Sequence, residues 1–66
     1  MTGTIIDDKN IIEYKTEQLL LSPQDYSISY IVSGQPVEHV IPWHFSKRQA
    51  ESREFVESQV KKDIYG

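Results

Sequence analysis

Residues 26–41 carry the clearest alternation of apolar and polar positions in the chain. In YSISYIV, every second residue from Tyr26 to Val32 is aromatic or branched apolar, which is typical of a half-buried β-strand. The segment SGQP separates it from VEHVI, and Gly34 can take the positive φ of a tight hairpin turn. A two-residue turn at 34–35 and a four-residue loop over 33–36 predict the same register. Its cross-strand pairs are Val32–Val37, Tyr30–His39 and Ile28–Ile41.

The stretch from Ser46 onward predicts a helix. Ser46 is a favourable N-cap, and Gln49 three residues later completes a capping-box pattern. The apolar residues that follow are spaced to form one stripe along the helix, namely Ala50, Phe55, Val56, Val60 and Ile64. A helix with so few apolar residues can cover one face of a small sheet and little more.

The first quarter of the chain permits two interpretations. Two isoleucine pairs flank DDKN, a turn-forming segment, and residues 12–17 alternate with period two. The competing interpretation is a helix over residues 11–21, capped by Asn10 and stopped by Pro23. We favour strands because Ile, Tyr and Thr are strand-forming types.

These elements predict an α+β fold, a small antiparallel β-meander of three to four strands with one C-terminal α-helix packed on a face. The chain of 66 residues is short enough for a single domain spanning 1–66. The expected strands cover about 2–7, 10–20, 25–33 and 36–42, and the expected helix about 46–64.

Charge and composition narrow the classes of partner. The net charge is −3, with −4 over residues 1–40 and +1 over residues 41–66, a distribution that argues against a general DNA binder. The chain has no cysteine, which excludes disulfides and favours a cytoplasmic location. No secretory signal is visible, and no apolar run approaches the roughly 20 residues of a membrane span.

The candidate chemistry is sparse. Two histidines, His39 and His44, fall short of the three or four ligands that a metal site needs, and as strand positions they point to opposite faces. No spacing links a serine to a histidine and a carboxylate, and there is no glycine-rich phosphate loop. We therefore expect no cofactor, no metal and no enzymatic activity, with His39 packed on Tyr30 across the hairpin.

The segment PWHFSKRQAESR, residues 42–53, is the most distinctive stretch for binding. Aromatic and arginine residues dominate binding hot spots, and they also stack on bases and neutralise phosphates. The structural alternative is that Trp43 and Phe45 anchor the helix to the sheet, which we favour because so small a protein has few large core residues. The candidate partner-binding residues of this stretch are Trp43, Lys47, Arg48 and Arg53.

The period-two pattern also predicts a second sheet face that the single helix cannot cover. Ile31 and Val40 lie on it, and Ile6 and Ile11 are expected to join them. An apolar patch on a sheet marks an interface, and a two-fold dimer burying this face would stabilise a small core. The acidic turn residues Asp7 and Asp8 are further candidates for contact with a basic partner.

The sequence thus favours a small non-enzymatic interaction or regulatory protein that binds another protein and associates with itself. The alternative is a nucleic-acid-binding accessory protein that uses the Trp43–Arg53 surface. Neither interpretation involves a membrane.

Overall fold

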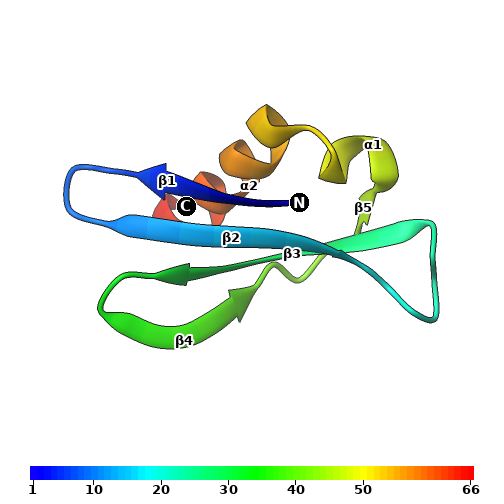
Figure 1. Cartoon of the computed structure of the whole chain (residues 1–66), viewed down its shortest axis with the longest axis horizontal. Helices are drawn as coiled ribbons and strands as arrows, with labels where there is room; N and C mark the ends of the chain where they lie inside the picture. Colours follow the sequence, from blue (N-terminus) through cyan, green and yellow to red (C-terminus); the bar gives the residue numbers. More distant parts are fainter.

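The computed structural model describes all 66 residues and shows an antiparallel sheet with two helices on one face (Figure 1). Strands β1 to β4 follow one another as a meander, in the order β1-β2-β3-β4, which confirms the predicted fold class. The elements are β1 (Thr2–Ile6), β2 (Ile11–Gln18), β3 (Asp25–Val32), β4 (Gln35–Val40), β5 (Phe45–Ser46), α1 (Lys47–Ala50) and α2 (Arg53–Tyr65). Neither helix is long and apolar enough to cross a membrane.

Strand β2 settles the two interpretations of the first quarter, because residues 11–18 form a strand rather than a helix. It pairs regularly with β1 on one side and with β3 on the other. Its even-numbered residues Ile12 and Tyr14 face the core, as do Ile28, Tyr30 and Val32 of β3. The period-two pattern therefore encodes which face of the sheet the helix covers.

The hairpin between β3 and β4 follows the predicted register at one end and departs from it at the turn. Tyr30 pairs with His39, and the backbone N–H of Ile41 donates to the carbonyl of Ile28 at 2.9 Å, as predicted. The predicted Val32–Val37 pair is wrong, because Val32 pairs with Gln35.

The turn explains this departure. The two residues between the strands are Ser33 and Gly34, and Gly34 takes a φ of 81°. Strand β4 therefore begins nearer the turn than predicted, and an irregularity in the β3–β4 ladder between Tyr30 and Val32 restores the register.

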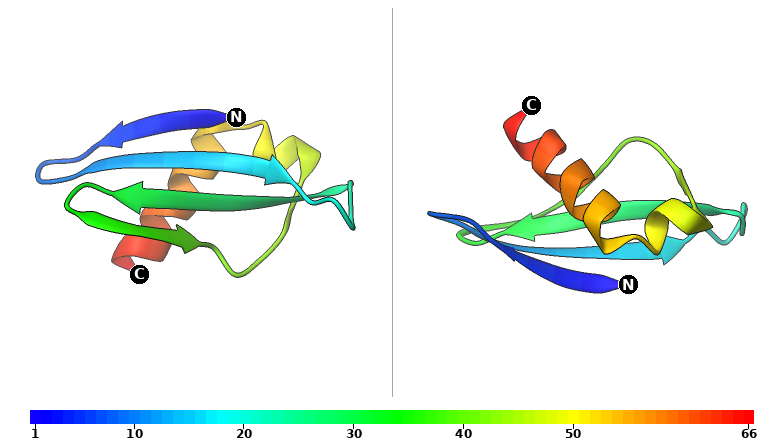
Figure 2. Two further views of the ribbon diagram at one scale, coloured as in Figure 1. Left: turned by 60° about the horizontal axis from the view of Figure 1, so that its bottom comes forward. Right: turned by 90° about the horizontal axis from the view of Figure 1, so that it is seen from above.

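The C-terminal region contains two helices where the sequence pattern predicted a continuous one over 46–64. Ser46 caps α1 through the predicted capping box: its Oγ accepts from the Gln49 N–H at 3.2 Å, and its own N–H donates to Gln49 Oε1 at 3.0 Å. The single-helix prediction is wrong at Ser52, whose backbone is extended and whose Oγ accepts from the Phe55 N–H at 3.2 Å. This second N-cap starts α2 in a new direction, so that α2 crosses the sheet (Figure 2).

Strand β5 is a further element that the pattern did not predict. Residues 45–46 pair with residues 25–26 of β3, on the side of β3 that β4 occupies further along. The pairing fixes Phe45 in the core, where its ring meets that of Phe55 edge to face with centroids 5.8 Å apart. The predicted anchoring role of Phe45 is confirmed.

Helix α2 is held to the sheet by a narrow apolar ridge with a polar bond on each side. Val56 and Val60 are completely buried, and Phe55 and Ile64 are packed against the same core. The Tyr14 hydroxyl donates to Glu57 Oε2 at 2.6 Å, and the Tyr30 hydroxyl donates to Asp63 Oδ2 at 2.5 Å. We call these four polar residues, Tyr14, Tyr30, Glu57 and Asp63, the tyrosine clamp.

The clamp depends on a glycine and an arginine at its β1 end. Arg53 Nη1 donates to the Tyr14 hydroxyl at 2.8 Å, and Tyr14 lies over Gly3 on the neighbouring strand. A Cβ at position 3 would overlap the Tyr14 hydroxyl and the Arg53 guanidinium. Burial and the Glu57 carboxylate raise the pKa of Tyr14, while Arg53 opposes the rise.

We predict that Tyr30→Phe lowers the free energy of unfolding by about 1 kcal/mol, because it removes one clamp hydrogen bond.

Burial and then the Asp63 carboxylate raise the pKa of Tyr30 from 10.0 to about 12. The unfolded chain therefore loses this proton first, and the contribution of Tyr30 to stability disappears as the pH rises from 10.0 to about 12. Across this pH range, the free energy of unfolding measured with urea should fall less steeply with pH in Tyr30→Phe than in the wild type. Tyr26→Phe, outside the clamp, is the control. The same dependence on pH in all three proteins would contradict the raised pKa of Tyr30.

Candidate functional site

The sheet has one face covered by α2 and one face that no element covers, which is turned toward the viewer in the left panel of Figure 2. The register places the odd-numbered residues of β2 and β3 on this open face, together with the even-numbered residues of β1. From β4 it carries Glu38 and Val40. The four apolar residues predicted for this face, Ile6, Ile11, Ile31 and Val40, are all exposed.

The centre of the open face is polar. Lys15 Nζ lies 3.0 Å from Glu17 Oε1 and 3.4 Å from Glu38 Oε2, so one lysine bridges two strands. These carboxylates raise the pKa of Lys15, with Glu17 the larger cause. Ser29 lies beside them and is buried, in a shallow hollow of about 380 Å³. The apolar residues of this face therefore do not form one continuous patch.

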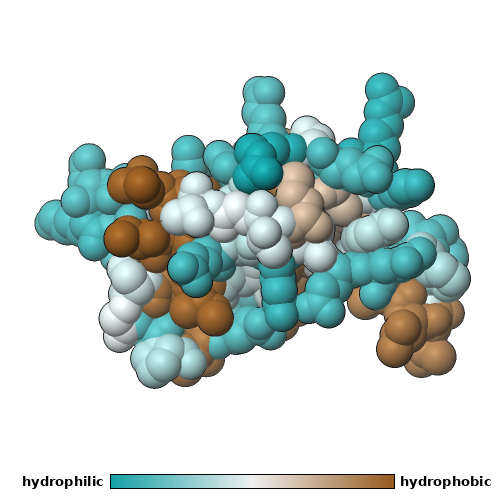
Figure 3. All heavy atoms as spheres, in the orientation of Figure 1, coloured by the Kyte–Doolittle hydropathy of each residue, from teal (hydrophilic) through white to brown (hydrophobic).

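The apolar side chains gather instead at the two ends of the sheet (Figure 3). Ile6 and Ile11 face each other across β1 and β2 at one end, and Ile31 lies one row further along β3. At the other end the loop between β2 and β3 carries Leu20 and Leu21, which are 98% and 99% exposed. Apolar side chains thus lie toward each end of the open face, and the charged side chains of Lys15, Glu17 and Glu38 lie between them.

The loop with the two leucines is closed by hydrogen bonds. The Leu19 N–H donates to the Asp25 carbonyl at 3.0 Å, and the Asp25 N–H donates to the Ser22 carbonyl at 2.8 Å. Gln18 Nε2 also donates to the Pro23 carbonyl at 2.7 Å. Leu20 and Leu21 therefore lie at the tip of a loop that is closed by hydrogen bonds. Because both side chains are fully exposed, neither contributes to the core.

A groove of about 660 Å³ lies between this loop and the open face. Its apolar wall consists of the loop leucines and Val40, and Glu17 and Glu38 supply acidic groups beside it. We call it the leucine groove, and its full lining is Glu17, Gln18, Leu19, Leu20, Leu21, Ser22, Ser27, Ser29, Glu38, Val40 and His44. Leu20 and Leu21 were not among the residues expected to bind a partner, because the second strand was expected to continue to residue 20, whereas β2 ends at Gln18. The run LLLSP, with a proline two residues after the last leucine, was the available signal.

Trp43 lies outside the core, and the expectation that it anchors the helix to the sheet is wrong. It is 61% exposed and borders a hollow of about 270 Å³ beside the end of α2, together with Ile41, Gln59, Lys62, Asp63 and Gly66. A bend at residues 42–43 interrupts the extended chain after Ile41, so Trp43 leaves the face that Ile41 and Phe45 share. Burial of Phe45 alone supplies the aromatic anchor.

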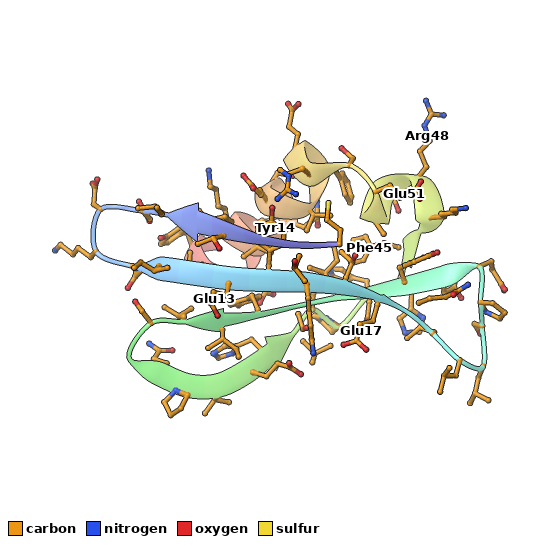
Figure 4. The ribbon with its side chains drawn as sticks, in the orientation of Figure 1. Glu13, Tyr14, Glu17, Phe45, Arg48 and Glu51 are labelled. Carbon is orange, nitrogen blue, oxygen red and sulfur yellow. The ribbon has the colours of Figure 1, made fainter.

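The basic residues expected to act with Trp43 occupy different places. Lys47 and Arg48 are exposed on α1, and Arg48 projects away from the body of the protein (Figure 4). Arg53 starts α2, where its guanidinium bonds to Tyr14 and, at 3.4 Å, to the Thr2 carbonyl. Lys62 borders the same hollow as Trp43. The helical rise places Arg53 about 14 Å from Lys62 along α2. Arg53 therefore works inside the fold and does not share a stacking platform with Trp43.

The acidic turn is partly engaged by the C-terminal helix. The Tyr65 hydroxyl donates to Asp7 Oδ2, and the Asp8 N–H donates to Asp7 Oδ1 at 2.8 Å. The Tyr65 bond lowers the pKa of Asp7. Asp7 thus ties α2 to the β1–β2 turn, and Asp8 is exposed.

The two histidines lie apart. His39 stacks on Tyr30 with ring centroids 5.1 Å apart, which confirms the predicted cross-strand contact, and His44 lines the leucine groove. No group of three or more His, Cys, Asp or Glu side chains is placed to hold a metal ion. Comparison with protein-family models, with curated proteins and with solved structures gives no match.

We predict that the double substitution Leu20→Ser, Leu21→Ser leaves the free energy of unfolding within about 0.5 kcal/mol of wild type, because both side chains are already in water. Binding of a hydrophobic fluorescent dye should fall by more than in the matched control Val37→Ser, an exposed apolar residue outside the groove. A large loss of stability would show that the leucines pack in solution.

Proposed function

We propose that this protein acts by binding another protein, and that the leucine groove receives an apolar segment of that partner. The observation that carries the proposal is the full exposure of Leu20 and Leu21 on a loop closed by hydrogen bonds. Burying two such side chains at an interface contributes about 1.5–3 kcal/mol each. The proposed role is that of a small non-enzymatic interaction or regulatory protein.

The charges around the groove define the chemistry of the partner. Glu17 and Glu38 border it, and a single lysine, Lys15, is shared between them. A partner segment with apolar side chains flanked by lysine or arginine matches this arrangement, since opposite charges at a rim favour encounter and orientation. An apolar segment flanked by acidic residues would meet like charge.

Photocrosslinking in the native host followed by calorimetry tests the proposal. A photoreactive side chain at position 21 should crosslink to the partner, and one at position 37 should not. With the purified partner, Leu20→Ser, Leu21→Ser should weaken binding by at least about tenfold, and the heat capacity change of binding should be negative. Val37→Ser is the matched control.

Unchanged affinity in the double variant would overturn the proposal. A captured nucleic acid, with affinity that falls steeply with salt, would instead support the alternative built on Trp43 and the basic residues.

A further inference from the structure

The two edges of the sheet differ in how they are protected. Edge strand β4 carries Pro36, the exposed charge of Glu38 and the ladder irregularity next to the turn, which are all devices that discourage pairing with another strand. Edge strand β1 has the sequence TGTII, with no proline and no charge, and it pairs with β2 in unbroken register over all five residues. The outer side of β1 therefore carries none of these devices, and its backbone can pair with another strand.

The backbone groups available on that outer side follow from the hydrogen-bonded ladder. Asp7 and Asn10 exchange two backbone bonds of 2.9 and 3.2 Å, and the Thr16 N–H donates to the Met1 carbonyl at 2.8 Å. In an antiparallel ladder, these bonds mean that the odd-numbered residues of β1 direct their backbone N–H and C=O groups toward β2. Thr2, Thr4 and Ile6 consequently direct their N–H and C=O groups outward.

No other element lies beside this edge (Figure 2). The only side chain bonded to it is Arg53, whose two terminal nitrogens are each 3.4 Å from the Thr2 carbonyl, longer than a strong N–H···O bond. The side chains of Thr2, Thr4 and Ile6 are exposed, and Ile6 is 82% exposed. A strand can therefore approach β1 without displacing any part of the core.

We propose that a second copy of this chain pairs antiparallel along β1, so that the two sheets join into one. The charges at the two ends of the strand select this occupant and its direction. Arg53 lies at the Thr2 end, and the acidic turn residues Asp7 and Asp8 lie at the other. Antiparallel self-pairing centred on Thr4 sets Thr2 against Ile6 of the second copy, and so brings each arginine toward the acidic turn of the other copy.

This arrangement is closed and self-complementary. A two-fold axis through the Thr4 pair satisfies the outward backbone groups of both strands at once, and no further copy can add at that edge. Pairing at the edge also leaves the charged centre of the open face in water, whereas a dimer packed face to face would have to bury Lys15, Glu17 and Glu38. In this arrangement two copies associate at the β1 edge and not through the open face, which was the face predicted from the sequence pattern.

An introduced cysteine tests the register, because the chain has no cysteine of its own. Directly opposed residues of a hydrogen-bonded antiparallel pair have Cα atoms about 5.5 Å apart, within the span of a disulfide. Thr4→Cys should therefore oxidise rapidly to a covalent dimer, and the matched control Val37→Cys on the other edge strand should not. Equal crosslinking of the two variants would overturn the proposal.

Sedimentation equilibrium tests the interface without a crosslink. The wild type should dimerise with rising concentration, and Thr4→Lys should weaken the dimer by at least about tenfold by opposing two like charges across the axis. Val37→Lys should not. A wild type that stays monomeric at the highest soluble concentration would overturn the proposal, as would loss of the dimer in Val40→Lys but not in Thr4→Lys. Leu20→Ser, Leu21→Ser should keep the dimer. Loss of self-association at β1 can therefore be distinguished from loss of partner binding at the leucine groove.

Discussion

The contact between helix α2 and the sheet is the interaction on which the rest of this structure depends. Only Val56 and Val60 of the helix are completely buried, a narrow ridge for holding a 13-residue helix on four strands. The tyrosine clamp widens that contact. Tyr14 and Tyr30 are directly opposite each other on β2 and β3, so their rings extend from the same row of the sheet to carboxylates on either side of the ridge. Because both hydroxyls have partners, the clamp adds area to the core without leaving a buried polar atom unpaired.

The same contact explains why so much surface is left for binding. One helix of this length covers one face of a meander, and the chain has no further element for the other. A protein that must keep this open face in water places charge at its centre, as Lys15 does with Glu17 and Glu38. The apolar residues are then displaced to the ends of the sheet, where the exposed leucines of the β2–β3 loop and the isoleucines beside the β1–β2 turn lie (Figure 3).

The two proposed binding surfaces depend on different interactions and lie at different places on the sheet. The leucine groove offers apolar side chains with an acidic border, which suits burial of an apolar segment. The β1 edge offers backbone hydrogen bonds, and its specificity comes from the register and from the charges at its ends. A dimer joined at β1 would present two leucine grooves on one extended sheet, so that a partner with two matching segments would bind more tightly than either site alone allows.

The sequence by itself determined the elements that local chemistry specifies. Alternation fixed the core face of β2 and β3, the Ser46–Gln49 box fixed the start of α1, and the Tyr30–His39 pair followed from the hairpin pattern. Tertiary structure decided the rest. The position of Trp43 depends on a bend after Ile41, and the exposure of Leu20 and Leu21 depends on where β2 ends. Arg53 and Asp7 bond to residues 39 and 58 positions away in the chain. Local patterns report the periodicity of a strand or a helix, whereas these positions are set by contacts that exist only once distant segments have packed together.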